Sequence, residues 1–378
     1  METIPAPLPA PARVGDHIAS VDTPALLLDL DAFEYNLRKL PETLKGRPIA
    51  IRPHAKAHKC PEIALRQIAL GAVGACVQKV SEAEALVDGG VEDVLVVNEV
   101  VGATKLTRLA RLATRARIGV CVDDRGNVGD IQAAAKVEGA DLDVYVEVNV
   151  GGNRCGVEPG PDAVELAQAI EGAAHLRFAG IHAYHGSAQH VRHFDERRAA
   201  IEAAAAKVKI VLPLLEAAGL PAEVVTGAGT GSYLFESESG VYTEIQPGSY
   251  VFMDADYARN LDRDGQPTRV FQQSLFILAT VMSHVHPGRA VVDAGLKAHS
   301  IDSGMPLVAD VPHARYTRAS DEHGVIEFDA PPTVKLGDKI RLIPGHCDPT
   351  VNLYDWFVCY RGERVEALWR ITGRGAFY

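Results

Sequence analysis

The sequence lacks the features that mark several specialised classes of protein. None of its six cysteines forms a Cys-x-x-Cys pair, so no zinc ribbon or disulfide framework is indicated, and reduced thiols in a cytoplasmic protein are expected. Basic residues are not in excess, since 38 Lys and Arg face 49 Asp and Glu, and a nucleic-acid partner is therefore not expected. A run of about 18 apolar residues is absent, so no membrane span is predicted. The Pro- and Ala-rich start has no basic segment followed by an apolar one, which argues against a signal peptide.

The sequence does have a regular alternation of short β-branched runs with Ala-, Leu- and Glu-rich segments. The eight runs are PIAIRPHAK (48–56), VGACVQKV (73–80), DVLVVNEV (93–100), RIGVCVDD (117–124), DLDVYVEVNVG (141–151), HLRFAGIHAYHG (175–186), AEVVTGAGTGS (222–232) and EIQPGSYVFMD (244–254). Strands alternating with helices predict βαβ units and a parallel sheet. Eight such units match a closed (β/α)₈ barrel of the TIM type. An open doubly wound sheet is the rival, but its phosphate loop would follow the first strand, where this sequence has no glycine.

The texture changes after residue 260, where short alternating segments such as RAVVDAGLK and KIRLIPG replace the helical patterns. We therefore predict an α/β protein with a barrel at 25–260, followed by a mostly antiparallel β domain at 261–378. Residues 1–24 are expected to form a tail plus a strand that joins the β domain. The strand in TPALLLDL is expected to pair with that domain, and the helix after it to be capped near Asp31. In the second barrel unit, Ser81 and Glu84 predict a capping box at a helix start.

Polar residues at the ends of the first strand indicate a site, because the carboxyl ends of barrel strands form the active-site face. By the two-residue period of a strand, Arg52, His54 and Lys56 share one face, and Lys59 points elsewhere. A lysine in a barrel mouth is desolvated and close to other cations. Both effects favour the neutral, nucleophilic amine that a Schiff base needs. A solvated basic loop on the rim is the alternative.

Two further segments carry chemistry. The loop GAGTGS (227–232) follows the seventh strand, where barrels often bind phosphate through backbone N–H groups; a flexible glycine turn is the alternative. In HCDPT (346–350), an extended backbone would point His346 and Asp348 to one side and Cys347 to the other. An imidazole and a carboxylate suit a divalent ion such as manganese, although the segment also fits a plain Asp-Pro turn.

Together these segments resemble the D-threonine aldolase family along nearly the whole chain. The shared motifs are RPHAKAHK (52–59), QKVSEAE (78–84), GGNRCGV (151–157), YHGS (184–187), TGAGTGS (226–232) and HCDPT (346–350). The resemblance implies a type III pyridoxal 5'-phosphate enzyme that works as a homodimer. It also implies a carbon–carbon lyase that cleaves β-hydroxy-D-amino acids such as D-threonine to glycine and an aldehyde, with a divalent metal such as Mn or Mg.

The resemblance also implies roles for individual residues. Lys56 carries the cofactor in preference to Lys59, and His346 with Asp348 holds the metal. The other expected cofactor contacts are Gln78, Arg154, Tyr184, Gly229, Thr230, Gly231 and Tyr257. His54, His58 and His185 are the candidates for moving protons.

Other functions remain open on the sequence. D-serine dehydration, 3-hydroxy-D-aspartate cleavage and racemisation are alternative reactions on the same fold. The related D-serine dehydratases carry a cysteine where this chain has Asp348, which favours the aldolase. A non-catalytic pyridoxal-phosphate carrier is disfavoured by the long β domain, and a metal-dependent barrel hydrolase is the weakest alternative.

Overall fold

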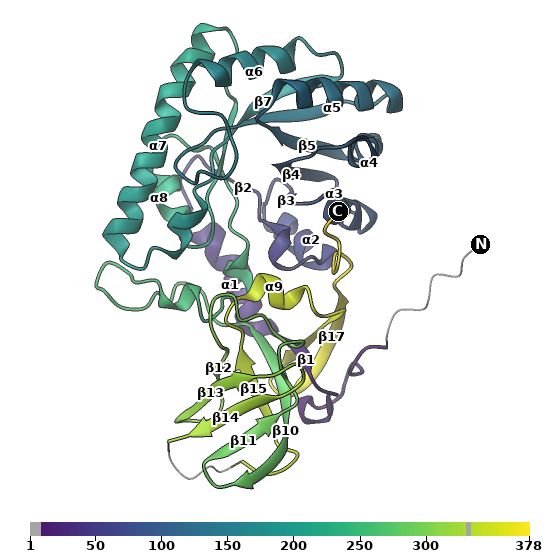
Figure 1. The fold of residues 1–378 in the computed structure, drawn as a ribbon, viewed down its shortest axis with the longest axis vertical. Coiled ribbons are helices and arrows are strands. Elements are labelled where there is room, and N and C mark those ends of the chain that lie inside the picture. Colours follow the sequence, from purple (N-terminus) through teal and green to yellow (C-terminus); the bar gives the residue numbers. More distant parts are fainter. Residues whose placement is uncertain (1–8, 330–333) are drawn as a thin grey trace, which may run out of the picture. The chain divides into compact units, whose positions relative to one another are not determined.

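The computed structural model describes residues 9–329 and 334–378 (Figure 1). Part of the expected N-terminal tail, residues 1–8, lies outside the described residues. The chain divides into two compact units. The barrel unit comprises residues 37–250, 259–269 and 376–378, and the β unit comprises residues 9–36, 251–258 and 270–375 within the described range.

The barrel unit contains eight parallel strands, one in each predicted run. They are β2 (Ala50–Ile51), β3 (Ala75–Val77), β4 (Asp93–Glu99), β5 (Arg117–Val122), β6 (Leu142–Glu147), β7 (Leu176–His182), β8 (Val224–Gly227) and β9 (Glu244–Ile245). Their order is β2-β9-β8-β7-β6-β5-β4-β3. A parallel bridge between His54 and Cys76 joins the two ends of this sheet. The predicted barrel is confirmed.

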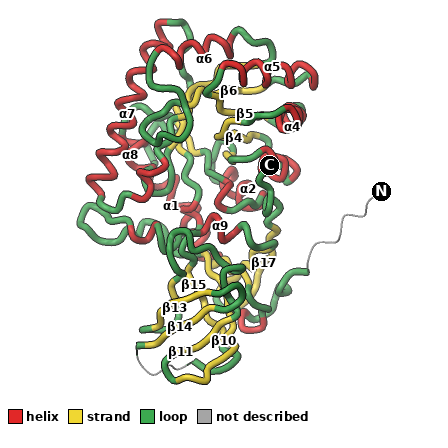
Figure 2. The backbone as a smooth tube through the Cα atoms, viewed as in Figure 1, coloured by secondary structure: helices red, strands yellow, loops and turns green. Residues whose placement is uncertain are grey.

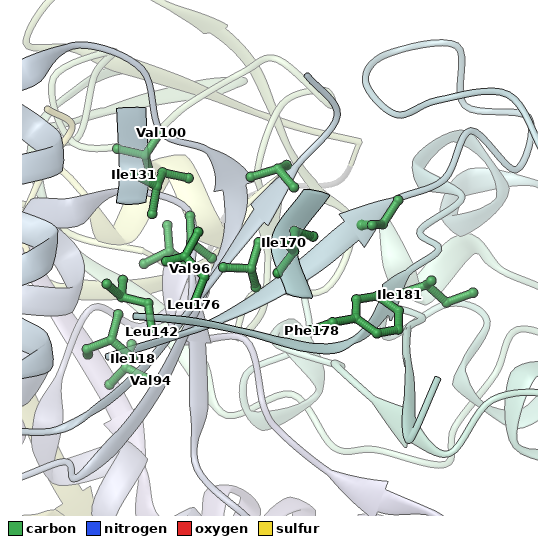
Figure 3. Close-up of a cluster of buried hydrophobic side chains, with 14 of the residues drawn as sticks. Val94, Val96, Val100, Ile118, Ile131, Leu142, Ile170, Leu176, Phe178 and Ile181 are labelled. Atoms are coloured by element: carbon green, nitrogen blue, oxygen red, sulfur yellow. The ribbon is translucent and has the colours of Figure 1, made fainter. Parts of the chain in front are cut away.

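Helices connect these strands and cover the outside of the sheet (Figures 1 and 2). They are α2 (Pro61–Ala69), α3 (Val80–Asp88), α4 (Ala103–Ala113), α5 (Arg125–Glu138), α6 (Pro161–Glu171), α7 (Phe194–Ala217) and α8 (Tyr233–Glu238). Strand residues such as Val94, Val96 and Ile118 pack with Ile131 of α5 and Ile170 of α6 in one large apolar cluster (Figure 3). The intervening residues of the strands, including Leu95, Cys121 and Tyr145, form a second cluster, as the two-residue period requires.

The β unit is a nine-stranded, mostly antiparallel sheet. It contains β1 (Ala25–Asp29), β10 (Leu275–His286), β11 (Arg289–Val292), β12 (Leu307–Val308), β13 (Ala314–Ala319), β14 (Gly324–Phe328), β15 (Lys339–Ile343), β16 (Trp356–Arg361) and β17 (Arg364–Arg370). As expected, β1 pairs here, antiparallel with β10 and parallel with β16. The helices α1 (Leu30–Thr43) and α9 (Cys347–Val351) complete the regular elements besides short 3₁₀ turns.

Two predicted helix caps are wrong in detail. The carboxylate of Asp29, not Asp31, accepts the amides that begin α1. At α3 the helix begins at Val80, so Ser81 already lies inside the first turn. Glu82 accepts the amides of Gln78 and Lys79 at 2.9 and 3.1 Å. The cap therefore falls at Lys79, two residues before Ser81, and does not use Glu84. Every helix among the described residues is too short or too polar to span a bilayer.

Candidate active site

Lys56 lies half-buried just beyond the end of the first barrel strand. β2 ends at Ile51, and residues 55–57 form a 3₁₀ turn. His54 caps this turn, because its Nδ1 accepts the backbone amide of Lys56 at 3.3 Å. The expectation that Arg52, His54 and Lys56 share one strand face is therefore wrong, because the extended backbone stops before Lys56. Arg52 points into the barrel core, where its guanidinium binds Glu244 at 3.0 Å.

The structure separates the two lysines of the motif. The ammonium of Lys59 lies 2.6 Å from a carboxylate oxygen of Glu82, and both side chains are less than a tenth exposed. The same carboxylate caps α3. Lys59 thus forms a buried ion pair. A charged, paired ammonium is not a nucleophile, so Lys59 is not suited to form a Schiff base.

Gln78 and His54 are brought together beside Lys56. The side-chain amide of Gln78 lies 3.0 Å from Nε2 of His54, and the backbone amide of Lys56 binds the other ring nitrogen. Asn98 Nδ2 donates to the carbonyl of Gln78 at 3.0 Å. His54 is therefore held in place from both sides of its ring.

Arg154 and Tyr184 also come together. The exposed guanidinium of Arg154 lies 5.6 Å from the centre of the half-buried Tyr184 ring, within the range of a cation–π contact. His185 follows Tyr184, and its Nδ1 accepts the amide of Ala188 at 3.3 Å. Burial lowers the pKa of His185, and the positive charge of Lys207 acts in the same direction. Both effects favour the uncharged ring, and because Nδ1 accepts a hydrogen bond, the uncharged ring carries its proton on Nε2.

The sequence analysis missed a buried acid–histidine pair on neighbouring strands. Glu147 and His182 are register partners on β6 and β7. Nδ1 of His182 binds the Glu147 carboxylate, and Nε2 lies 3.2 Å from Oε1 of Gln246. Burial favours the neutral ring, but the Glu147 carboxylate outweighs it and raises the pKa of His182. The signal was present, because Glu147 follows the interior-facing Tyr145 by two residues.

The glycine loop after β8 is tightly held. The amide of Gly231 donates to Oε1 of Gln189 at 3.0 Å, so that amide is already engaged within the protein. Thr230 is 8% exposed, and its hydroxyl oxygen is buried without a hydrogen-bond partner among the described residues. A buried hydroxyl without a partner costs free energy unless a ligand satisfies it. This fits an anionic group such as the cofactor phosphate.

In the β unit, His346 has a carboxylate partner that the sequence analysis did not identify. Nδ1 of His346 lies 2.7 Å from Oδ2 of Asp302. Burial favours the neutral ring of His346, but Asp348 and Asp302 outweigh it and raise its pKa. Since Asp302 engages Nδ1, Nε2 is the nitrogen that suits a metal.

The predicted extended segment at 346–348 is wrong. His346 has an extended backbone but is the cap of α9, which begins at Cys347. Cys347 does not face away from the carboxylates, because its Sγ lies 3.3 Å from Oδ1 of Asp348. The buried carboxylate of Asp254 accepts the amides of Cys347 and Tyr257 at 2.9 and 2.8 Å. Burial raises the pKa of Asp254, although these hydrogen bonds oppose the shift. Tyr257 belongs to the β unit, and its expected phosphate contact stays a prediction.

Comparison with known proteins follows this division of the chain. Residues 28–256 match the family model described as "Alanine racemase, N-terminal domain", and residues 274–360 match the "Putative serine dehydratase domain". A D-threonine aldolase from Arthrobacter sp. is 48% identical, with 97% of each chain covered. The chain belongs to the D-threonine aldolase family. The resemblance drawn from the motifs is therefore confirmed.

Two other proteins are about equally similar to this chain. A 3-hydroxy-D-aspartate aldolase from Paracoccus denitrificans (strain Pd 1222) is 49% identical, covering 97% of this chain and 96% of its own. The crystal structure of a D-threonine aldolase from Filomicrobium marinum is 52% identical, with a TM-score of 0.95 and coverage of 98% and 100%. The predicted alanine-racemase-like fold and the predicted enzyme class, a lyase, are confirmed.

Proposed function

We propose that this protein is a pyridoxal 5'-phosphate- and divalent-metal-dependent aldolase that cleaves β-hydroxy-D-amino acids to glycine and an aldehyde. Two aldolases, one named for D-threonine and one for 3-hydroxy-D-aspartate, each share almost half of their residues with it from end to end. The observation in the structure that carries the proposal is the contrast between the two lysines. Glu82 holds Lys59 in a buried ion pair, whereas Lys56 lies half-buried beyond the end of β2, next to the ring of His54.

The residues of the barrel unit fit the cofactor. Lys56 would hold it covalently, and Thr230 offers a buried hydroxyl without a partner for its phosphate. Arg154 would hydrogen-bond the phenolic oxygen of the ring, with Tyr184 near the ring nitrogen and Gln78 beside Lys56. Gly229 and Gly231 shape the phosphate loop. Tyr257, which belongs to the β unit, remains a proposed phosphate contact.

The residues of the β unit fit a divalent ion. His346 and Asp348 would hold it, and their imidazole and carboxylate form a donor set suited to Mn²⁺ or a similar ion. Asp302 fixes the ring of His346 through Nδ1. Asp254 fixes the backbone at Cys347. These contacts orient the ring of His346 and fix the backbone directly before Asp348.

When bound, pyridoxal phosphate supplies an electron sink for breaking the Cα–Cβ bond, and the divalent ion supplies a Lewis acid for the substrate hydroxyl. The chain supplies binding and proton positions. His54 and His185 are the proposed proton carriers, and the neutral ring of His185 presents its proton on Nε2. His58 is a third candidate.

A product assay tests the proposal. Purified protein is incubated with D-threonine, 3-hydroxy-D-aspartate and D-serine, with L-threonine as the stereochemical control. Glycine should form from the first two and not from L-threonine, and a metal chelator should stop its release. A 2-oxo acid with ammonia in place of glycine would identify a dehydratase, and interconversion of threonine without cleavage would identify a racemase.

A further inference from the structure

Gln189 forms hydrogen bonds to the glycine loop through both the nitrogen and the oxygen of its side-chain amide. It lies in the turn after β7, between residues 186 and 190, and is 1% exposed. Its amide nitrogen donates to the Ser232 hydroxyl at 2.7 Å, and its amide oxygen accepts the amide of Gly231 at 3.0 Å. Its backbone carbonyl accepts from Asn260 at 3.0 Å. One side chain therefore binds two adjacent residues of the loop, Gly231 and Ser232.

The glycines of the loop admit this side chain. A Cβ atom at Gly229 would lie 2.5 Å from the amide oxygen of Gln189, and one at Gly231 would lie 2.4 Å from its backbone oxygen. Both separations are far below van der Waals contact, so any larger residue would displace Gln189. Glycine at positions 229 and 231 thus allows Gln189 to come close enough to the loop to form its hydrogen bonds.

A second buried residue orients the serine of the loop. The hydroxyl of Ser232 accepts from Gln189 and donates to a carboxylate oxygen of Glu236 at 2.7 Å. Glu236 lies in α8 and is also 1% exposed. Because Ser232 has its proton directed at Glu236, its lone pairs face Gln189. The contacts form a chain from Gln189 through Ser232 to Glu236.

Thr230 directly precedes the two residues bound by the Gln189 side chain. Its hydroxyl is buried and has no partner among the described residues. This is an independent sign of a ligand, because native proteins rarely leave such an atom unsatisfied. The two hydrogen bonds from Gln189 to Gly231 and Ser232, called the clamp below, thus fix the backbone directly after Thr230, whose hydroxyl has no partner among the described residues.

We propose that Gln189 is a positioning residue for the cofactor phosphate, which holds the loop 227–232 in its binding conformation without touching the ligand. The inference rests on the proposed function, since it takes pyridoxal 5'-phosphate as the ligand. Preorganisation raises affinity because the loop does not have to be ordered when the phosphate binds.

The test separates the phosphate from the rest of the cofactor. Cofactor-free protein is titrated with pyridoxal 5'-phosphate and with pyridoxal, which has the same aldehyde and ring but no phosphate, and visible absorbance reports binding of each. Gln189→Met should lose about tenfold or more of the preference for the phosphorylated form, a change of about 1.4 kcal/mol. Its affinity for pyridoxal should equal that of the wild type.

Gln67→Met is the matched control. Gln67 is another buried glutamine of the barrel unit, 3% exposed, and its amide donates to Tyr250. This variant loses a comparable buried hydrogen bond away from the loop, so its preference for the phosphate should be unchanged. If both variants lose the preference equally, the effect is general destabilisation and the inference is overturned.

Two further outcomes separate a failure of the inference about Gln189 from a failure of the proposed function on which it rests. A preference kept in full by Gln189→Met overturns the inference and leaves the proposed function standing. A wild-type protein that binds both aldehydes equally overturns the phosphate site itself, and the inference with it. If Gln189→Met does not fold, Ser232→Ala removes one of the two clamp contacts. It should then show the same selective loss to a smaller degree, and an unchanged preference would overturn the inference.

Discussion

At the scale of single residues, Glu236 is a buried acid whose surroundings change its pKa. Its side chain is buried, one oxygen accepts from Ser232, and the other has no partner among the described residues. Burial raises the pKa of Glu236 to about 7. Within the folded protein the group is therefore protonated up to near neutral pH, whereas in the unfolded chain it ionises near its ordinary value.

This difference predicts how stability depends on pH. Because the pKa of Glu236 is higher in the folded protein than in the unfolded chain, protonated Glu236 adds to the free energy of unfolding at low pH. This contribution is lost as the pH rises from about 4.5 to about 7. Glu236→Gln imitates the protonated acid. Relative to wild type it should gain about 3 kcal/mol of unfolding free energy between pH 5 and pH 8, as measured by urea denaturation. Glu238→Gln, at a partly exposed surface pair with Arg47, should show no such trend. A pH-independent difference for Glu236→Gln would contradict the assignment.

The proposed metal ligands give a second prediction at this scale. His346→Ala and Asp348→Ala should each abolish glycine release from D-threonine, because an unassisted hydroxyl is too weak an acid to lose its proton. Both variants should keep the visible absorbance of the bound cofactor, since that depends on the barrel. Manganese should restore chelator-treated wild type and neither variant. Normal cleavage by either variant in the presence of chelator would show that the ion is bound elsewhere or not needed.

Asp302 extends this prediction to a residue that the sequence did not reveal. It binds Nδ1 of His346, and losing such a partner typically weakens metal binding by about 10- to 100-fold. Asp302→Asn should therefore weaken manganese affinity in a calorimetric titration of the protein. Asp310, whose carboxylate pairs with Arg341 elsewhere in the β unit, provides the control variant Asp310→Asn. Equal affinities in the two variants would show that Asp302 does not orient the ligand.

At the scale of elements, the start of α3 joins a helix cap to a buried ion pair. Glu82 accepts two backbone amides and binds Lys59. Glu84, two residues later, pairs with Arg108 where both side chains are partly exposed. Removing one partner of a buried pair costs about 3–5 kcal/mol, whereas a surface pair contributes below about 1 kcal/mol.

Glu82→Gln should therefore lower the unfolding free energy by about 3 kcal/mol, and Glu84→Gln should change it little. Thermal or urea denaturation of the two variants side by side measures the difference. Equal losses would mean that the ion pair with Lys59 is not formed in solution. In that case the argument that selects Lys56 as the cofactor lysine would lose its structural support.

The eight barrel strands were predictable because each lies in a short β-branched run, and the chain repeats such runs with helical segments between them. The pairing of β1 in the β unit was predictable because its strand precedes the first barrel run. Short turns were not predictable in the same way. The turn at Ala55–Ala57 and the helix α9 depend on hydrogen bonds to His54 and to Asp254. Asp254 lies 93 positions from Cys347, a separation that no local pattern reports.

The residues of the candidate site that lie in a motif were predictable from the sequence. The residues that support them from distant parts of the chain were not. Lys56, His346 and the loop 227–232 stand out by residue type and position. Asp302 and Gln189 do not, because their roles depend on which residue the fold places beside them. The Glu147–His182 pair lies between these cases, since strand alternation placed Glu147 inside the barrel although its partner was not apparent.

At the scale of the whole molecule, we expect a homodimer, because the resemblance to the D-threonine aldolase family implies one. Light scattering at the concentration used for activity assays measures the state directly. The expected mass is twice that of the 40.5 kDa chain. A fully active species with the mass of one chain would contradict the expectation.

The central claim is that Lys56 carries pyridoxal 5'-phosphate, and one measurement tests it most directly. The purified protein is reduced with borohydride, which makes the bond between cofactor and lysine permanent, and its peptides are sequenced by mass spectrometry. The account predicts the phosphopyridoxyl group on Lys56 and an unmodified Lys59. A modified Lys59, or a cofactor attached to neither lysine, would contradict it.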